Sequence, residues 1–408
     1  MKVKSNTIIF LSLVFVILSL QAFSLVRDYS TPPPCTRVVN VTENFKVLIN
    51  CDSALFMKDA DQPTRLFTGQ SGYQDRPLNA ITAHVISRFI STLGITDQQL
   101  TVTGNSGSSY TYSTNIYIAY ILINVLVLIL TISLLFKVYI QFKPEISLSN
   151  LNESNVIALN LLLLVGLNEI TKTFFWTPHS QLFNLLFPAL SIYLLSKVYK
   201  TRSIKDYAVK VISIVILTFF YPLFLILILI LLLYKNIKLP FKVVASFFAA
   251  ISYFSYPRVI ELLGGKYRNP AIDEFRQFYW PFDILVGRES SSLFFIQIKE
   301  LILSVPVFPG LILIAITLYR KSMDRSVLYA KLNNSRIYLW FALSYFVFLL
   351  GIGLGVRRLT FGLIVFLLLW KSFELIQSKS NRRGMVQAGL AIAGFQLASW
   401  FFSNGPLI

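Results

Sequence analysis

The chain has 408 residues, of which 55% are hydrophobic and only 14% are charged. Soluble domains carry about 25% charged residues, so this composition excludes an ordinary globular protein, and the long apolar runs exclude a collagenous or disordered chain. The formal net charge of +18 would suit a nucleic-acid-binding surface in a soluble protein. In a membrane protein the same excess is expected to orient the spans, and no nucleic-acid partner is expected.

Apolar segments of about 20 residues recur along the chain, as transmembrane helices require. The first, 8–26, follows Lys2 and Lys4, which indicates a cytoplasmic N-terminus. A cleaved signal peptide is the alternative, because Ala22-Phe23-Ser24 resembles a cleavage site. Further spans are expected at 116–136, 155–175, 182–199, 242–261, 300–319, 337–356, 359–375 and 384–402.

The segment 211–234 is expected to enter the membrane and turn back. Tyr221-Pro222 interrupts it midway, and proline breaks a helix because it lacks an N–H donor and clashes with the preceding turn. Two helices joined at this break would leave Lys210 and Lys235 on the same, cytoplasmic side.

The distribution of charge supports this topology. The cytoplasmic segments hold 21 Lys and Arg against five acidic residues, whereas the external segments hold 16 against 14. This is the positive-inside pattern, and the external excess is Arg357 and Arg358. The sequence therefore predicts an all-α polytopic integral membrane protein with about ten or eleven transmembrane helices and an extracytoplasmic C-terminus.

Three parts are expected: 1–26 as the first transmembrane helix, 27–115 as a large extracytoplasmic loop, and 116–408 as a multi-span domain with an external loop at 264–299. Cys35 and Cys51 are the only cysteines. Both fall in 27–115, where an oxidising compartment would permit a disulfide. Zinc-ligand spacings, phosphate-binding loops and nucleophile elbows are absent from the sequence, which gives no support to soluble-type zinc, ATPase or hydrolase chemistry.

The external loop contains a pattern of acidic, aromatic and small residues. The four-residue spacing of Asp52, Phe56 and Ala60 favours one helix face. This order resembles the GT-C superfamily, polytopic glycosyltransferases that use polyprenyl-phosphate or polyprenyl-diphosphate sugars at the extracytoplasmic face. The broken hairpin and the late external arginines are similar as well. The residues that match the motif are Asp52, Phe56, Ala60, Gly72, Tyr73, Pro77 and Leu78.

The resemblance implies sugar transfer from a polyprenyl-phosphate-linked donor to a glycan, lipid or protein acceptor. Asp52 would act as general base. Many family members have two adjacent acids at this position, but Ser53 follows Asp52, so the ligand pair for a divalent metal is incomplete. A divalent metal therefore stays open as an alternative to catalysis without a cofactor. The other implied site residues are Tyr73, Asp75, Arg76 and His179 for substrate, and Arg357 and Arg358 for the donor phosphate.

Each assignment has a structural alternative. Asp52 would otherwise cap a helix, Asp75 and Arg76 would form an ion pair that fixes the loop, and His179 would be an ordinary interfacial residue. Arg357 and Arg358 would then extend toward lipid head groups.

Two other functions compete with the enzyme: a transporter or flippase of lipid-linked glycans, and a non-catalytic membrane subunit with a GT-C-like fold. The expected location is the bacterial inner membrane, with membrane lipids as neighbours.

Overall fold

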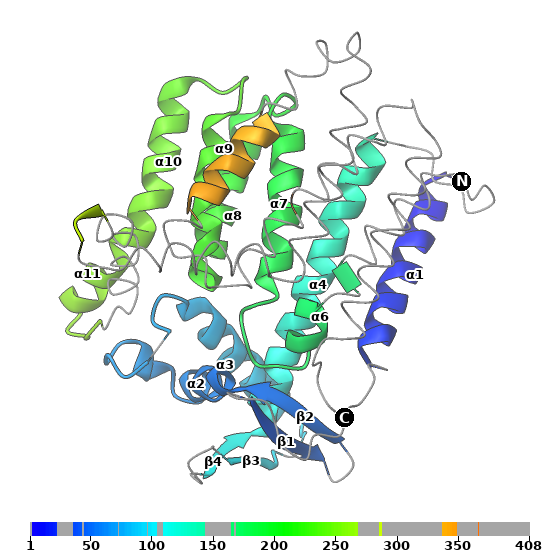
Figure 1. Ribbon diagram of the computed structural model, residues 1–408, viewed down its shortest axis with the longest axis vertical. Helices are drawn as coiled ribbons and strands as arrows, with labels where there is room; N and C mark the ends of the chain where they lie inside the picture. Colours follow the sequence, from blue (N-terminus) through cyan, green and yellow to red (C-terminus); the bar gives the residue numbers. More distant parts are fainter. Residues whose placement is uncertain are drawn as a thin grey trace.

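The computed structural model describes residues 2–22, 36–42, 45–71, 73–95, 97–103, 109–142, 165–166, 169–267, 285–287, 337–348 and 366. Long helices stand roughly parallel, and two shorter helices and a small β-sheet lie together at one end of them (Figure 1). Most of the described residues are helical, which confirms the helical character expected from the sequence.

The first eight elements in chain order are the long helix α1 and seven shorter elements in the segment 36–113. They are α1 (Lys2–Ala22), β1 (Thr36–Thr42), β2 (Phe45–Asn50), α2 (Cys51–Asp61), η1 (Pro63–Leu66), α3 (Pro77–Thr92), β3 (Gln99–Thr103) and β4 (Ser109–Ser113). The remaining elements are α4 (Thr114–Phe142), α6 (Glu169–Phe174), α7 (Phe183–Lys197), α8 (Ile204–Phe220), η2 (Pro222–Leu227), α9 (Ile228–Leu232), α10 (Leu239–Phe254), α11 (Tyr256–Leu262) and a helix at Ile337–Phe348.

A small β-sheet lies beside the helices, in the segment that the sequence predicts as an external loop. Its four strands follow the order β2-β1-β3-β4, and neighbouring strands are antiparallel. Thr36 of β1 pairs with Asn50 of β2, directly before α2 begins. Valine and threonine are frequent in β1, and such β-branched residues favour strands. The sheet thus leads the chain into the helix that carries Asp52.

The number of membrane spans is smaller than the sequence predicts when only the described residues are counted. Thr114–Val138 of α4 is the one described helix that is long and apolar enough to cross a membrane alone. Helices α10 and α11 meet this condition as a pair that bends by 49°. The predicted spans at 300–319, 359–375 and 384–402 lie outside the described residues, apart from Phe366.

The predicted break at Tyr221-Pro222 is confirmed. Helix α8 ends at Phe220, Tyr221 is extended with φ −157° and ψ 110°, and η2 begins at Pro222. The chain then returns along α8, since the Tyr207 hydroxyl near the start of α8 donates to the Leu231 carbonyl at 3.3 Å. Tyr221 therefore lies at the tip of a helical hairpin.

Helix α1 is tied into the fold by polar and close apolar contacts. The Gln21 amide donates to the carbonyl of Gly166, and the Trp176 indole donates to the carbonyl of Gln21 at 3.0 Å. A Cβ at Gly166 would come within 2.8 Å of the Ile17 side chain, so only glycine permits this approach. These contacts join α1 to the segment that contains Gly166 and Trp176.

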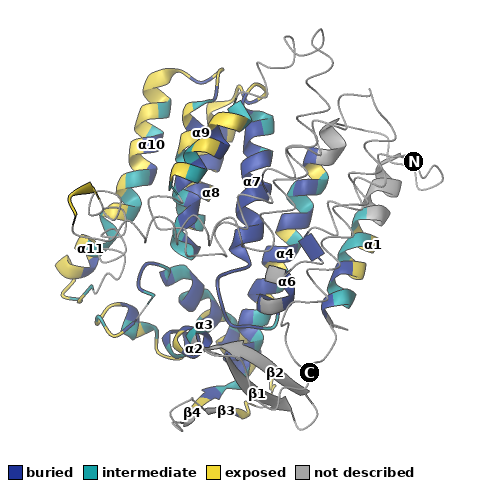
Figure 2. Cartoon of the chain, viewed as in Figure 1, coloured by how far each residue is buried: buried dark blue, intermediate teal, exposed yellow. Residues whose placement is uncertain are grey.

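Burial differs sharply from one helix of the bundle to another (Figure 2). Helix α7 is buried along nearly its whole length, whereas α10 exposes large apolar side chains such as Val244 and Phe247, each 66% exposed. Helix α7 is thus at the core of the bundle, and one face of α10 is apolar and uncovered.

Candidate functional site

Five residues singled out in the sequence lie together at the end of the bundle that carries the sheet. They come from separate parts of the chain: the first turn of α2, the turn before α3, and the connection between α6 and α7. The tip of the α8–η2 hairpin adds a sixth side chain. The residues are Asp52, Tyr73, Asp75, Arg76, His179 and Tyr221.

Asp52 and His179 form the centre of the cluster. The distance between Asp52 Oδ2 and His179 Nε2 is 3.7 Å, which is too long for a direct hydrogen bond and brings the carboxylate beside the imidazole. The Asp52 side chain is 39% exposed and that of His179 only 2%. Rings of Phe56 and Phe174 hold the imidazole, with centroid distances of 4.8 Å and 5.2 Å. The carboxylate therefore faces accessible space from a rigid, buried support.

Tyr73 orients the Asp52 carboxylate. Its hydroxyl hydrogen-bonds to Asp52, and its ring stacks on Phe56 at a centroid distance of 4.1 Å. Burial raises the pKa of Tyr73, and the Asp52 charge raises it further, so the hydroxyl remains a donor at neutral pH. Asp52, Phe56 and Ala60 all lie on α2 with the four-residue spacing of one helix face, and Phe56 and Ala60 are buried.

The Asp75–Arg76 pair joins the loop to the bundle. Arg76 Nε donates to Asp75 Oδ2 at 3.1 Å, and Nη1 donates to Ser180 Oγ at 2.8 Å. The guanidinium carbon lies 5.5 Å from the Tyr73 ring centroid and 5.2 Å from that of Tyr221, so the group is held between two aromatic faces. Among the described residues, Nη2 of Arg76 makes no hydrogen bond.

Three residues of this site were not predicted as site residues from the sequence: Ser180, Asn184 and Tyr221. The Tyr221 hydroxyl donates to Asn184 Oδ1 at 3.0 Å, and Asn184 Nδ2 donates to Gln181 Oε1 at 2.6 Å. The proline after Tyr221 was the available signal, because a helix break in a membrane must be lined by other protein groups.

A buried clamp supports the turn that carries Tyr73. Asp59 accepts hydrogen bonds from Ser71 and from Arg65, the latter at 3.3 Å, and Ser71 Oγ accepts from the Tyr73 backbone N–H at 2.9 Å. Burial raises the pKa of Asp59, and the bonds from Ser71 and Arg65 oppose this rise. The clamp fixes the turn against α2.

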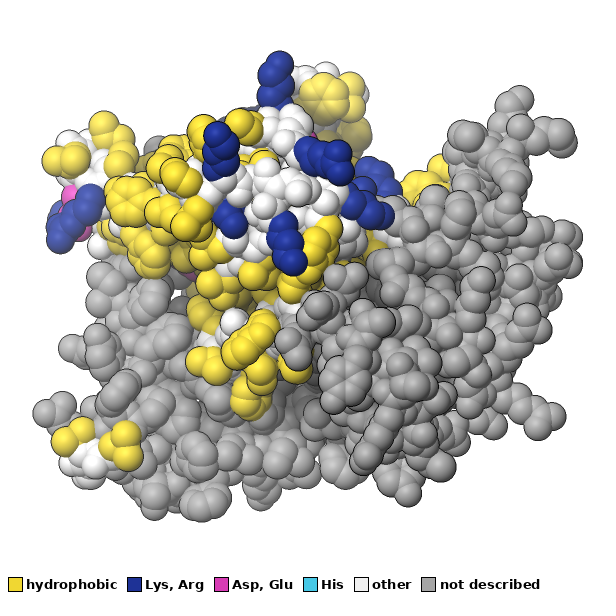
Figure 3. Space-filling view, turned by 90° about the horizontal axis from the view of Figure 1, so that it is seen from above, with side chains coloured by type: hydrophobic (Ala, Val, Ile, Leu, Met, Phe, Trp, Pro, Cys, Tyr) yellow, Lys and Arg dark blue, Asp and Glu magenta, His cyan; other side chains and the backbone are white. Residues whose placement is uncertain are grey.

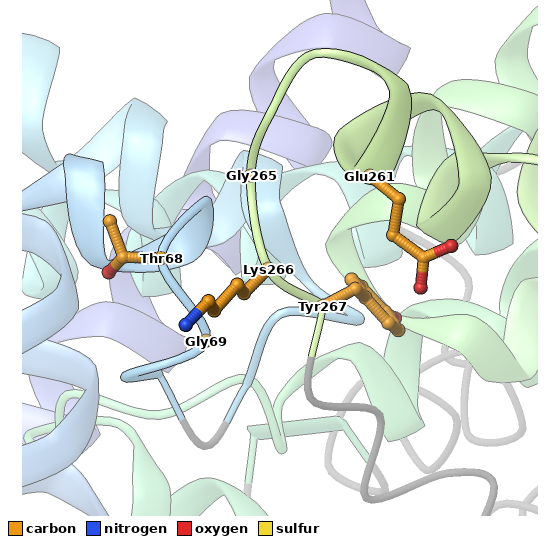
Figure 4. Close-up of a pocket in the computed structure, with 6 residues that line it drawn as sticks. All are labelled: Thr68, Gly69, Glu261, Gly265, Lys266 and Tyr267. Carbon is orange, nitrogen blue, oxygen red and sulfur yellow. The ribbon is translucent and has the colours of Figure 1, made fainter.

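An open cavity of about 450 Å³ adjoins the site (Figure 4). Gln74 connects the two, since its amide donates to the carbonyls of Leu66 at 2.5 Å and Lys266 at 2.9 Å. Burial raises the pKa of Tyr267, and the nearby Asp75 charge contributes. The residues that line the cavity are Thr68, Gly69, Glu261, Gly265, Lys266 and Tyr267.

The described residues do not fit a divalent-metal site. They contain no group of three or more His, Cys, Asp or Glu side chains arranged to hold a metal. Ser53, which occupies the place of the second acid, is fully buried, whereas Asp52 is partly exposed. The two positions therefore do not face a shared accessible space, as a pair of metal ligands would.

Several predicted residues fall outside the described part of the chain. Arg357 and Arg358 lie there, as do Cys35 and Gly72, and most of the external loop 264–299. The proposed donor-phosphate arginines and the disulfide between Cys35 and Cys51 remain predictions from the sequence.

Comparisons with models of known protein families, with characterised proteins and with solved structures give no match to this chain. The resemblance to the GT-C superfamily consequently rests on the sequence motif and layout alone.

Proposed function

We propose that the protein is a polytopic membrane glycosyltransferase of the GT-C type that takes a sugar from a polyprenyl-phosphate-linked donor at the extracytoplasmic face. The observation that carries the proposal is the convergence of Asp52, Tyr73, Arg76 and His179, four residues that the amino-acid sequence alone singles out. They come from three separate segments of the chain: the first turn of α2, the turn before α3, and the connection between α6 and α7.

Exposed apolar surface supports the membrane location. Helix α10 presents Val244, Phe247 and Phe248 at exposures of 53% or more, and α8 presents Val209 and Ile212 at 61% and 53%. Contiguous apolar surface of this extent is rare on soluble proteins. The 16 residues of α10 extend about 24 Å, close to the thickness of the hydrocarbon core. The exposed face of these helices would contact acyl chains.

The proposed reaction is a single displacement at the anomeric carbon. The acceptor hydroxyl oxygen attacks this carbon, its proton passes to the Asp52 carboxylate, and the bond from the anomeric carbon to the phosphate oxygen breaks. The electron pair of that bond leaves with the polyprenyl phosphate. Asp52 is suited to the role of base because it is accessible and is oriented by the Tyr73 hydroxyl.

Arg76 is suited to the charge that develops on the departing phosphate. Its Nη2 is uncommitted among the described residues, and a planar guanidinium can present two donors to phosphate oxygens. Arg357 and Arg358 would add to this binding from the later spans. Asp75 would then hold Arg76 in position and contact the sugar.

The test is sugar transfer by the full-length protein in liposomes, with a polyprenyl-phosphate hexose as donor and release of polyprenyl phosphate as the measurement. Asp52→Asn should lower the rate by about 10² to 10⁴, the usual contribution of a general base. Asp61→Asn is the matched control, because Asp61 is an exposed carboxylate on the same helix. Unchanged transfer by folded Asp52→Asn would refute its role.

A non-catalytic subunit is the second candidate, and the serine at position 53 favours it. A flippase would move the lipid-linked sugar with no bond formed. Wild-type protein that binds the donor and transfers nothing would support the subunit, and movement of intact donor across the bilayer would support the flippase.

A further inference from the structure

The end of the bundle opposite the candidate site is built from two basic turns. One turn, 198–203, joins α7 to α8, and the other, 233–238, joins α9 to α10. The Lys235 backbone N–H donates to the Val198 carbonyl at 3.3 Å, and Asn236 Nδ2 donates to the Tyr199 carbonyl at 2.8 Å. These bonds hold the two turns side by side, so their positive charges form one fixed surface.

This surface, the basic end, carries cations without matching acids. Asp206 is the acid on these turns and the first turn of α8, and it already pairs with Lys210 at 2.6 Å. Viewed from above, Lys and Arg side chains gather over this end of the molecule (Figure 3). The residues of the basic end are Lys200, Arg202, Lys205, Lys235, Lys238 and Lys242, and within the described chain none of them forms an ion pair.

Apolar and aromatic groups border these cations. Lys235 Nζ lies 4.6 Å from the ring centroid of Tyr199, which is 37% exposed. Ile204, Leu239 and Phe241 follow directly along α8 and α10, with exposures of 55%, 63% and 50%. A ligand that matches this surface carries an anionic group beside a long apolar chain. A soluble polyanion would leave the apolar border exposed to water.

We propose that the basic end binds the head groups of anionic phospholipids, with their acyl chains along the exposed faces of α8 and α10. Tyrosine and lysine at a membrane interface are suited to this arrangement, because the ring lies at head-group level and the ammonium group meets phosphate. The inference depends on the proposed membrane location and is independent of sugar transfer.

Lipid retention by the purified full-length protein tests the proposal. The detergent-solubilised protein is incubated with equal amounts of phosphatidylglycerol and phosphatidylcholine, and bound lipids are counted by native mass spectrometry. Wild-type protein should prefer phosphatidylglycerol. The triple variant Lys200→Gln/Lys235→Gln/Lys238→Gln should lose this preference by a factor on the order of tenfold to a hundredfold, since each surface cation contributes to attraction. Equal binding of the two lipids by wild-type protein would overturn the proposal.

The matched control removes the same charge at the other end of the molecule, as Lys58→Gln/Arg88→Gln/Lys266→Gln. It should keep the preference, and a loss equal to that of the first variant would overturn the proposal by showing a response to net charge alone. High salt should weaken the wild-type preference, which tests the inference even where the triple variant does not fold. If inorganic phosphate alone displaces phosphatidylglycerol, the basic end is an anion site without lipid recognition, and the proposal is overturned.

The lipid experiment and the transfer experiment can refute their two proposals independently. Protein that prefers phosphatidylglycerol but transfers no sugar would refute the glycosyltransferase and leave the lipid surface in place. Protein that remains in the aqueous phase without detergent would remove the membrane location on which both depend.

Discussion

Substitutions in the Asp75–Arg76 pair distinguish a structural role from a functional role, because they can be measured by stability and by sugar transfer. Replacing Arg76 with glutamine removes its bonds to Asp75 and Ser180 and leaves the Asp75 carboxylate, whose side chain is 10% exposed, without a cation. Breaking a buried pair from one side usually costs about 3–5 kcal/mol. Because the Arg76 side chain retains 18% exposure, water screens the pair, and we expect a loss near the lower end, about 3 kcal/mol.

A double-mutant cycle measures this coupling. Asp75→Asn/Arg76→Gln should be more stable than the sum of the two single changes predicts, by about 2 kcal/mol, because neither side chain is then left as a buried charge without its partner. The measurement is the free energy of unfolding by denaturant titration in detergent micelles. Costs that add within about 0.5 kcal/mol would refute the ion-pair argument.

Arg76→Lys distinguishes phosphate binding from support. Lysine keeps the positive charge beside Asp75 but loses the planar fork and its contact with two aromatic rings. If Arg76 binds the donor phosphate, transfer should fall far more than stability does. A variant that loses stability and activity in proportion would leave Arg76 as a structural residue only.

Two further predictions concern the external segment. Cys35 precedes Thr36 in the sequence and Cys51 follows Asn50, and Thr36 and Asn50 pair at the end of β1 and β2. We therefore expect one disulfide in protein prepared without reductant, and Cys51→Ser should destabilise the protein by about 3 kcal/mol. Two thiols that alkylate without reduction would contradict this. Burial raises the pKa of Asp59 above its ordinary value of 3.8, so the folded protein binds this proton more tightly than the unfolded chain does. The stability contribution of Asp59 therefore falls as pH rises from about 4 through the raised pKa, and Asp59→Asn should remove that slope from unfolding free energies measured across this range.

Local patterns in the sequence predicted the parts of the site that depend on neighbouring residues. The four-residue spacing predicts the helix that carries Asp52, and proline chemistry predicts the break at Tyr221. Both are present, the helix as Cys51–Asp61. The sheet was not predicted because its strands have only five to seven residues and mix apolar with polar side chains, a weaker pattern than the long apolar runs of the helices.

Long-range contacts were beyond the reach of local patterns. The sequence places His179 in a short turn and does not predict its burial. The contacts of its ring with Phe56 and Phe174 depend on packing between distant segments. The contact of Arg76 with Tyr221 depends on where the hairpin tip comes to rest, which periodicity does not specify. Local patterns therefore identified candidate site residues by their chemistry, but they did not predict which residues from distant segments contact them.

The contacts of α1 constrain the order in which the protein assembles. Gln21 donates to the carbonyl of Gly166, a residue 145 positions later in the chain. In the membrane protein that we propose, α1 would enter the bilayer before Gly166 and Trp176 have been made, and the Gln21 amide would then lie in an apolar setting where an unsatisfied polar group is costly. In that case α1 would reach its final packing only after the segment that contains Gly166 has arrived.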